Sequence, residues 1–168
     1  MNKVYWITGL SGAGKTAVGK ALYEKIKPEQ PNTVLLDGDE LREVFGGDLG
    51  YSAEDRRKCA MRYSKLCKML SEQGLNVIIC TISMFHEIHE WNRENIPGYT
   101  EIFLDVPFEI LKKRDQKGLY SDYGKGTSNN LIGLDIKAEK PKNPDIIIEN
   151  NGSISITECI ERILRDKK

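Results

Sequence analysis

The chain has 168 residues, and its 25 Lys and Arg side chains balance its 25 Asp and Glu side chains. This length suits one domain over residues 1–168 and is too short for two substantial ones. A formal net charge of zero gives no global field that attracts nucleic acid or an anionic membrane, so small molecules are the expected partners. The sequence shows no leader and no apolar run of about 18 residues, which predicts a cytoplasmic protein.

A phosphate-binding loop follows the first predicted strand, residues 4–7. It reads Gly-Leu-Ser-Gly-Ala-Gly-Lys-Thr over positions 9–16, a full match to the P-loop pattern. The glycines let several backbone N–H groups and the following helix converge on one anion. Lys15 is then expected to bridge the β- and γ-phosphates of ATP, and Thr16 to complete the shell of a Mg²⁺ ion carried by the nucleotide. The nucleotide-binding residues predicted here are Gly9, Ser11, Gly12, Ala13, Gly14, Lys15 and Thr16.

Helical and strand patterns alternate along the rest of the chain. Strands are expected at 33–37, 75–81, 101–105 and 145–149, and helices at 15–27, 52–73, 85–95, 107–114 and from a turn at Gly152 to the C-terminus. This order predicts an α/β protein with the three-layer fold of P-loop NTPases and kinases: a mainly parallel five-stranded central sheet flanked by helices. Ser52 is the expected N-cap of its helix, with Asp55 three residues on.

Cysteine and histidine spacings give little sign of metal or disulfide chemistry. Cys59, Cys67, Cys80 and Cys159 form no Cys-x-x-Cys pair, so free thiols are expected. His86 and His89 lie three residues apart on a predicted helix, but no third ligand with suitable spacing accompanies them. A zinc site is therefore not expected.

Three aspartates lie where predicted strands end. Asp37 and Asp39 follow the strand at 33–37, and Asp105 closes the strand at 101–105. Because the carboxyl ends of parallel strands meet at one edge of a sheet, these side chains are expected near the P-loop. A carboxylate beside an acceptor hydroxyl can take its proton during phosphoryl transfer, and Asp39 is the predicted catalytic residue together with Lys15. Asp37 could hold Mg²⁺ or substrate, and each aspartate could instead cap a following helix.

Several segments, in order along nearly the whole chain, resemble adenylylsulfate kinases. Besides the P-loop they are Leu-Asp-Gly-Asp-Glu-Leu-Arg at 36–42, Asp-Leu-Gly-Tyr-Ser at 48–52 with an Asp-Arg pair at 55–56, Lys-Arg-Asp-Gln-Lys-Gly-Leu-Tyr at 113–120, and Gly-Leu-Asp at 133–135 with Pro-Lys-Asn-Pro at 141–144. The resemblance implies a kinase that moves the γ-phosphate of ATP to the ribose 3′-hydroxyl of a nucleotide whose phosphate is linked to sulfate. It also implies a homodimer, although no feature of the sequence itself locates an interface.

The resemblance assigns roles to individual side chains. It places Asp39 beside the acceptor hydroxyl, lets Arg42 and Arg56 hold the acceptor nucleotide, and packs Tyr51 on its base. Forked guanidinium groups suit phosphate and sulfate oxygens, and an aromatic ring offers a stacking face, although all three side chains could be only structural. A mobile lid is expected at about 115–130, where a long polar loop is predicted. The resemblance adds Arg114 on the ATP side, and on the acceptor side Asp37, Cys59, Ile82, Ser83, Lys117, Gly118 and Leu119.

The chain departs from the family pattern on the acceptor side. Cys59 and Met61 stand where family members usually have Asn and Arg, and Ser121 follows Gly-Leu-Tyr where they have Lys. Residues 82–86 read Ile-Ser-Met-Phe-His against an Ile-Ser-Pro-aromatic-Arg pattern. Each unpaired polar group in a buried site costs about 1 to 3 kcal/mol, so such changes can alter which acceptor is preferred. The P-loop, which is expected to bind the phosphate donor ATP, matches its pattern at every position.

These departures leave the acceptor open. One variant of the family phosphorylates the ribose 3′-hydroxyl of a cytidine nucleotide with a phosphoramidate end, in the assembly of capsule phosphoramidate groups, and the chain resembles that variant. Adenylylsulfate and another nucleotide are the alternatives. A P-loop protein that senses nucleotide without transferring phosphate is a further alternative. It is disfavoured because Asp39, Arg42 and Arg56 are all present, and a GTPase switch is disfavoured because the Asn-Lys-x-Asp sequence is missing.

Overall fold

A computed structural model describes residues 2–115 and 117–165, so Met1, Gln116 within the expected lid and the last three residues of the expected C-terminal helix lie outside the described part. The strands are β1 (Val4–Thr8), β2 (Thr33–Asp37), β3 (Asn76–Cys80), β4 (Tyr99–Leu104) and β5 (Ile146–Ile148). The helices are α1 (Lys15–Ile26), α2 (Gly38–Val44), α3 (Ala53–Glu72), α4 (His86–Asn95), α5 (Phe108–Arg114), α6 (Leu119–Gly124) and α7 (Ile156–Arg165). None of the described helices is both long enough and apolar enough to cross a bilayer.

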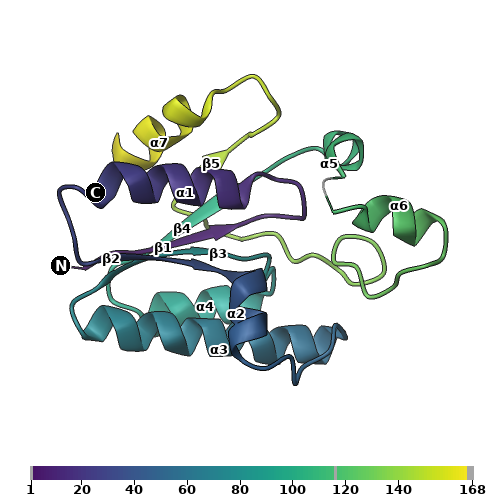
Figure 1. The fold of residues 1–168 in the computed structure, drawn as a ribbon, viewed down its shortest axis with the longest axis horizontal. Coiled ribbons are helices and arrows are strands. Elements are labelled where there is room, and N and C mark those ends of the chain that lie inside the picture. Colours follow the sequence, from purple (N-terminus) through teal and green to yellow (C-terminus); the bar gives the residue numbers. More distant parts are fainter. Residues whose placement is uncertain (1, 116, 166–168) are drawn as a thin grey trace.

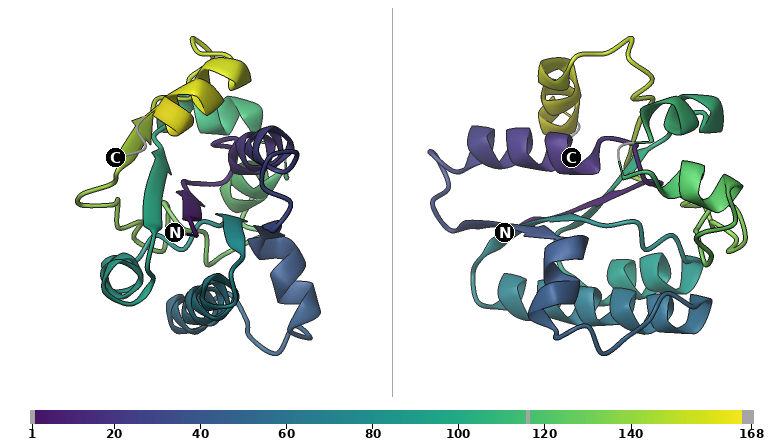
Figure 2. Two further views of the ribbon diagram at one scale, coloured as in Figure 1. Left: turned by 90° about the vertical axis from the view of Figure 1, so that its left-hand side faces the viewer. Right: turned by 45° about the vertical axis from the view of Figure 1, so that its right-hand side comes forward.

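The five strands form one parallel sheet in the order β2-β3-β1-β4-β5. All five residues of β1 and of β3 are buried, because these central strands are covered on both faces. Helices α1 and α7 pack together on one face, and α3 and α4 pack together on the other (Figure 1). The predicted three-layer α/β fold is therefore confirmed, and the two further views show the same layers (Figure 2).

Parallel strand order brings the functional segments to one edge. The P-loop follows β1, Asp37 ends β2, and Asp105 follows β4, so all three lie at the carboxyl edge of the sheet. Asp37 pairs with Cys80 of β3 in the strand register, which places the end of β2 one strand away from β1. The fold thus collects at one edge the residues that the sequence singles out for phosphate chemistry.

Two helices correct the sequence-based expectations. No helix bounds were predicted directly after β2, yet α2 begins at Gly38, because the Asp37 carboxylate caps it by accepting the Asp39 N–H at 3.0 Å. The stretch 115–130, expected to be a loop, contains α6. The Asp115 carboxylate accepts the N–H groups of Tyr120 and Ser121 at 2.9 and 3.0 Å, which satisfies the free donors at the start of that helix.

The C-terminal helix begins at Ile156, four residues after the Gly152 turn, and its expected end lies outside the described residues. The remaining predicted elements agree with the structure to within about two residues, the usual uncertainty of element ends. Ser52 caps α3 as expected, and its hydroxyl accepts the Asp55 N–H at 3.1 Å. Asp55 does not complete a reciprocal capping box. Its carboxylate instead accepts the N–H of Gly50 at 3.1 Å, so it holds the preceding loop against α3.

Candidate active site

The P-loop adopts the strained backbone that its glycines permit. Gly12 and Gly14 have φ angles of 85° and 93°, in the left-handed region where a side chain is costly. A Cβ on Gly14 would also lie 2.5 Å from Asn150 Nδ2. Lys15 Nζ donates to the Leu10 carbonyl at 2.9 Å, which folds the lysine back over the loop. Burial lowers the pKa of Lys15 to about 8, and the nearby carboxylates of Asp39 and Asp37 only partly offset this.

Side chains from the C-terminal half hold the outer side of the P-loop. Three consecutive carbonyl groups of the loop each accept a hydrogen bond, so they are tied away from the inner surface where N–H groups are needed. The bonds run from Tyr120 Oη to Ser11 O (2.7 Å), from Arg114 Nη1 to Gly12 O (3.0 Å) and from Asn150 Nδ2 to Ala13 O (2.8 Å). Arg114 also donates to the Asn150 carbonyl at 2.6 Å. Arg114, which the resemblance placed on the ATP side, therefore supports the backbone of the P-loop.

Thr16 and Asp37 form an oxygen pair beside the P-loop. Thr16 Oγ1 donates to Asp37 Oδ2 at 2.8 Å. A hydroxyl and a carboxylate are ligands that suit Mg²⁺, which usually takes one or two protein oxygens and fills its shell with phosphate and water oxygens. The pair therefore fits the metal ion that the motif predicts. In residues 2–115 and 117–165 no group of three or more His, Cys, Asp or Glu side chains is arranged to hold a metal by itself.

Asp39 lies across from the segment expected to be the lid. Its carboxylate forms an ion pair and hydrogen bond with Lys117, and both side chains are more than half exposed. A contact between residues 78 positions apart brings α2 and the start of the 115–130 segment together. The third candidate aspartate, Asp105, is engaged elsewhere, with Lys140 Nζ 3.3 Å from its carboxylate. The structure therefore brings Asp37 and Asp39, rather than Asp105, together with the P-loop lysine.

Two arginines enclose Tyr51. The guanidinium carbons of Arg42 and Arg56 lie 4.3 and 5.2 Å from the centre of the Tyr51 ring, close enough for cation–π attraction. Arg42 donates to the Gly50 carbonyl at 3.0 Å, and Arg56 Nη2 donates to the Asn130 carbonyl at 2.8 Å. Tyr51 remains 57% exposed. The three residues predicted to hold an acceptor nucleotide are thus assembled in one cluster with an open aromatic face.

The remaining acceptor candidates differ in their exposure to solvent. Cys59 is buried and donates from Sγ to Tyr63 Oη at 3.0 Å. Ile82 is half-buried, and its carbonyl accepts a hydrogen bond from the Thr8 hydroxyl. Ser83 is buried, with a positive φ of 35° and its Oγ 2.7 Å from the Thr81 hydroxyl.

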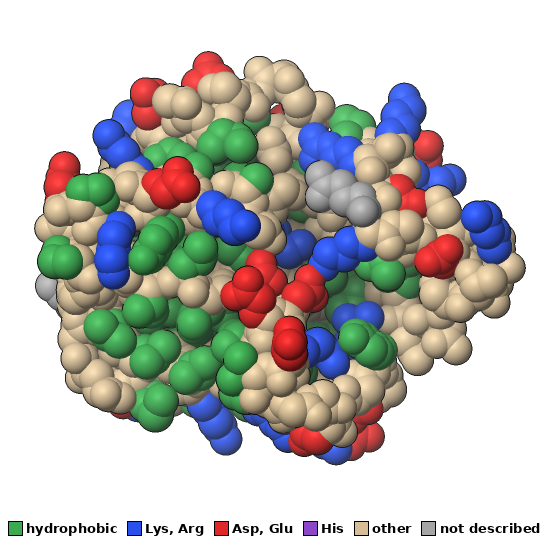
Figure 3. Space-filling model, in the orientation of Figure 1, with side chains coloured by type: hydrophobic (Ala, Val, Ile, Leu, Met, Phe, Trp, Pro, Cys, Tyr) green, Lys and Arg blue, Asp and Glu red, His purple; other side chains and the backbone are tan. Residues whose placement is uncertain are grey.

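The last two acceptor candidates stand at the start of α6. Gly118 is its N-cap at φ 67°, and Leu119 begins the helix and packs partly against the core beneath α1. These placements leave Ile82, Gly118 and Leu119 partly accessible, whereas Cys59 and Ser83 are covered. Figure 3 shows a hollow between α2 and the α6 region, with acidic side chains on the α2 side and basic side chains around it.

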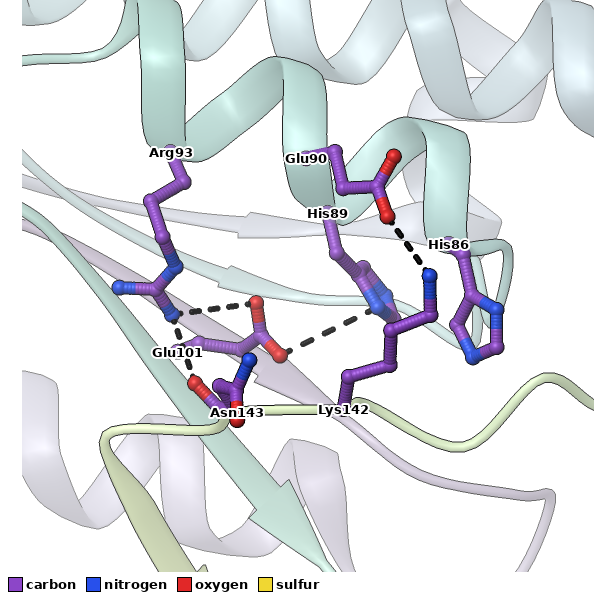
Figure 4. A pocket seen from close by; sticks show the side chains of 7 residues that line it. All are labelled: His86, His89, Glu90, Arg93, Glu101, Lys142 and Asn143. Carbon is purple, nitrogen blue, oxygen red and sulfur yellow. Dashed lines mark hydrogen bonds and ion pairs between the residues drawn. The ribbon is translucent and has the colours of Figure 1, made fainter.

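A cavity of about 90 Å³ lies between α4 and β4 (Figure 4). It is lined by His86, His89, Glu90, Arg93, Glu101, Lys142 and Asn143. His89 Nδ1 is 3.9 Å from the Glu101 carboxylate, and Arg93 pairs with both Glu101 and Asp145. Burial lowers the pKa of His89 to about 4, so its imidazole is neutral at pH 7. His86 and His89, the two histidines considered as metal ligands from the sequence, therefore both line this cavity.

Sequence reasoning missed several supporting residues. Tyr63, Tyr120 and Asn150 each donate to a backbone carbonyl of a site segment. Such bonds leave no motif at Tyr63 and Asn150, because any suitable donor can make them, whereas Tyr120 closes the family-like segment at 113–120 but was given no role of its own. Asn150 had one signal, since it directly follows the last predicted strand and parallel order places that end at the P-loop edge. The pairing of Lys117 with Asp39 had no signal in the sequence.

A P-loop at the start of α1, a hydroxyl and carboxylate pair beside it, and a carboxylate facing the opposite segment define a phosphotransferase of the P-loop class. Residues 1–149 match the profile of the family described as Adenylylsulphate kinase. The chain belongs to this family.

Individual relatives agree with that assignment. The cytidine diphosphoramidate kinase of Campylobacter jejuni is 41% identical over 162 residues, covering 96% of this chain and 94% of the relative. The adenylyl-sulfate kinase of Pseudomonas aeruginosa is 41% identical over 148 residues, covering 87% and 76%. The structure of Mycobacterium tuberculosis APS kinase CysC in complex with AMPPNP and APS matches with a TM-score of 0.89 at 31% identity, covering 98% of this chain and 96% of that one.

Proposed function

We propose that the chain transfers the γ-phosphate of ATP to the ribose 3′-hydroxyl of a nucleotide, and that its acceptor is cytidine diphosphoramidate. The observation that carries the proposal is the position of Asp39 on α2, at the carboxyl edge of the sheet. Its carboxylate lies near enough to Lys15 to offset part of the lowering of that lysine's pKa by burial, and it contacts Lys117 of the facing segment. A carboxylate between a P-loop and a cluster of arginines is well placed to serve an acceptor hydroxyl.

In the proposed reaction each group of the site has one role. The P-loop N–H groups and Lys15 bind the phosphate tail of ATP and stabilise charge on the transferring group. Thr16 and Asp37 would hold Mg²⁺, which would supply positive charge to neutralise the phosphate oxygens. The acceptor 3′-oxygen bonds to the γ-phosphorus as the bond to the bridging oxygen of ADP breaks. Asp39 takes the hydroxyl proton and returns it to solvent. Residues 115–130 act as a lid that covers the site, so that water is excluded during transfer.

The choice of acceptor is supported by two observations, one on the sequence and one on a relative. The departures from the adenylylsulfate kinase pattern are concentrated there, at Cys59, Met61, residues 82–86 and Ser121. A relative with a match over 96% of this chain is a cytidine diphosphoramidate kinase. An unchanged donor side with an altered acceptor side is the pattern expected when a kinase keeps ATP and changes its second substrate.

The decisive experiment compares acceptors. Wild-type protein with ATP and Mg²⁺ is given cytidine diphosphoramidate, CDP or adenylylsulfate, ADP release is followed, and the position of the new phosphate is determined by phosphorus NMR. We expect the highest kcat/KM with cytidine diphosphoramidate and a product phosphorylated at the 3′-oxygen. A preference for adenylylsulfate would assign the chain to that reaction, which the relative from Pseudomonas aeruginosa makes the second candidate. Nucleotide binding without acceptor-stimulated ADP release would indicate a nucleotide sensor.

A further inference from the structure

Helix α2 carries Asp39 and Arg42 but is held by few contacts of its own. It has seven residues, of which only Gly38 and Leu41 are buried. So short a helix has little intrinsic stability, and its direction depends on what it packs against. The direction of the Asp39 side chain therefore depends on the contacts that fix the first turn of α2.

Tyr63 of α3 contacts α2 at both of its ends. Its hydroxyl donates to the Gly38 carbonyl at 2.7 Å, and its ring stacks on Phe45, the C-cap of α2, with centroids 6.2 Å apart. Tyr63 is 3% exposed, and burial raises the pKa of its hydroxyl, which keeps the proton available for donation. Cys59, one turn earlier on α3, donates to the same hydroxyl oxygen at 3.0 Å.

The carbonyl that Tyr63 holds belongs to Gly38, which packs closely against β3. A Cβ on Gly38 would lie 3.2 Å from Thr81 Oγ1 and 3.3 Å from the Cys80 carbonyl, so its Cα is pressed against the end of β3. On the other side the Asp37 carboxylate binds the Asp39 N–H at 3.0 Å. The peptide that precedes Asp39 is thus clamped between β3, the Asp37 cap and the Tyr63 hydroxyl.

We infer that Tyr63 is a positioning residue for phosphoryl transfer: its hydroxyl fixes the first turn of α2 and so aims Asp39 at the acceptor hydroxyl, with Cys59 completing a hydrogen-bond chain from α3. Cys59 stands where adenylylsulfate kinases usually have Asn, and here its thiol is buried against Tyr63 and serves the catalytic aspartate through that residue. The inference rests on the proposed function, because it assumes that Asp39 acts on an acceptor hydroxyl.

The test separates positioning from general stability by kinetics. Wild type, Tyr63→Phe and the control Tyr99→Phe are compared with ATP and the best acceptor. Tyr99→Phe also removes a hydroxyl hydrogen bond, the partly buried 3.0 Å bond to Glu101, but Tyr99 lies at the start of β4 and away from the site. Both variants should unfold at a slightly lower temperature. Only Tyr63→Phe should lower kcat, by about tenfold, the scale of one lost hydrogen bond that aligns a reacting group, with KM for both substrates changed less than twofold.

Cys59 provides a second and independent check. Cys59→Ala should lower kcat by about threefold, Cys59→Ser should recover part of that loss because it keeps a donor, and Cys59→Ala with Tyr63→Phe should be no slower than Tyr63→Phe alone. Additive losses, or a Tyr63→Phe enzyme with wild-type kcat, would overturn the inference while wild-type activity still supports the proposed function. Should Tyr63→Phe not fold, the Cys59 series decides. A wild type that transfers phosphate to none of the acceptors would refute the proposed function instead.

Discussion

The two halves of the site are built differently. The donor region, which is the P-loop with α1, consists of backbone groups fixed by the sheet and by three side-chain donors, and Ala13 within it is 1% exposed. The acceptor region, which is α2, residues 45–52 and the first turns of α3, consists of side chains on lightly packed elements, and Tyr51 and Val44 are 57% and 75% exposed. A backbone site allows few substitutions, whereas a side-chain site can change its ligand one residue at a time. In the acceptor region the departures from the family pattern fall on α3, at Cys59 and Met61, whereas the P-loop matches its pattern throughout.

The largest expected effect is loss of the P-loop charge. Lys15→Ala should lower turnover by between about 10² and 10³-fold, because the ammonium stabilises charge on the transferring group. Its folding should be unchanged by circular dichroism, and Lys25→Ala, at the exposed end of the same helix, should keep full activity. Substantial turnover in Lys15→Ala would remove the donor region from the mechanism.

Asp39→Asn tests whether the Asp39 carboxylate of the acceptor region takes the proton of the acceptor hydroxyl. The amide keeps the shape of the side chain but cannot accept the proton, so kcat should fall by about 10²-fold with acceptor KM changed by less than about threefold. Steady-state kinetics against Glu43→Gln, an exposed carboxylate on the same helix, provide the control. A rise in KM at constant kcat would make Asp39 a binding residue only.

A double substitution addresses acceptor choice. Cys59→Asn with Met61→Arg restores the family residues and should shift the ratio of kcat/KM values toward adenylylsulfate by about tenfold or more, given the cost of about 1 to 3 kcal/mol for an unpaired polar group. Met69→Arg, an exposed change on the same helix, should leave the ratio as in the wild type. An unchanged ratio in the double variant would place selectivity in residues 115–130.

The smallest effect concerns ATP binding and pH. With a pKa of about 8, Lys15 in the free protein is mostly protonated at pH 7 and mostly neutral at pH 8.5, while bound phosphates favour the protonated form. The dissociation constant of a non-hydrolysable ATP analogue should therefore rise by about fourfold between these pH values, measured by calorimetry. Lys15→Arg keeps its charge over this range and should abolish that rise. A pH-independent wild type would contradict the lowered pKa.

The same contrast explains what the sequence could predict. Apolar runs and the eight-residue P-loop pattern depend on local periodicity and backbone geometry. Strands such as β1 and β3 were therefore predicted correctly, and the predicted glycine-rich turn has its left-handed glycines at positions 12 and 14, whereas its role in binding nucleotide stays a prediction. Helix α2 received no bounds, because it has a single capping aspartate and almost no apolar face. Helix α6 was missed for a related reason: its start is stabilised by Asp115, four residues before Leu119, in a segment rich in glycine. Contacts such as Lys117 with Asp39 depend on the tertiary fold and have no sequence pattern.

The pairing of Lys117 with Asp39 has a consequence for the order of events in the proposed reaction. In the structure the Lys117 ammonium occupies the Asp39 carboxylate. Under the proposed function, an acceptor hydroxyl has to displace this ammonium before Asp39 can take its proton, so arrival of the second nucleotide would open the ion pair.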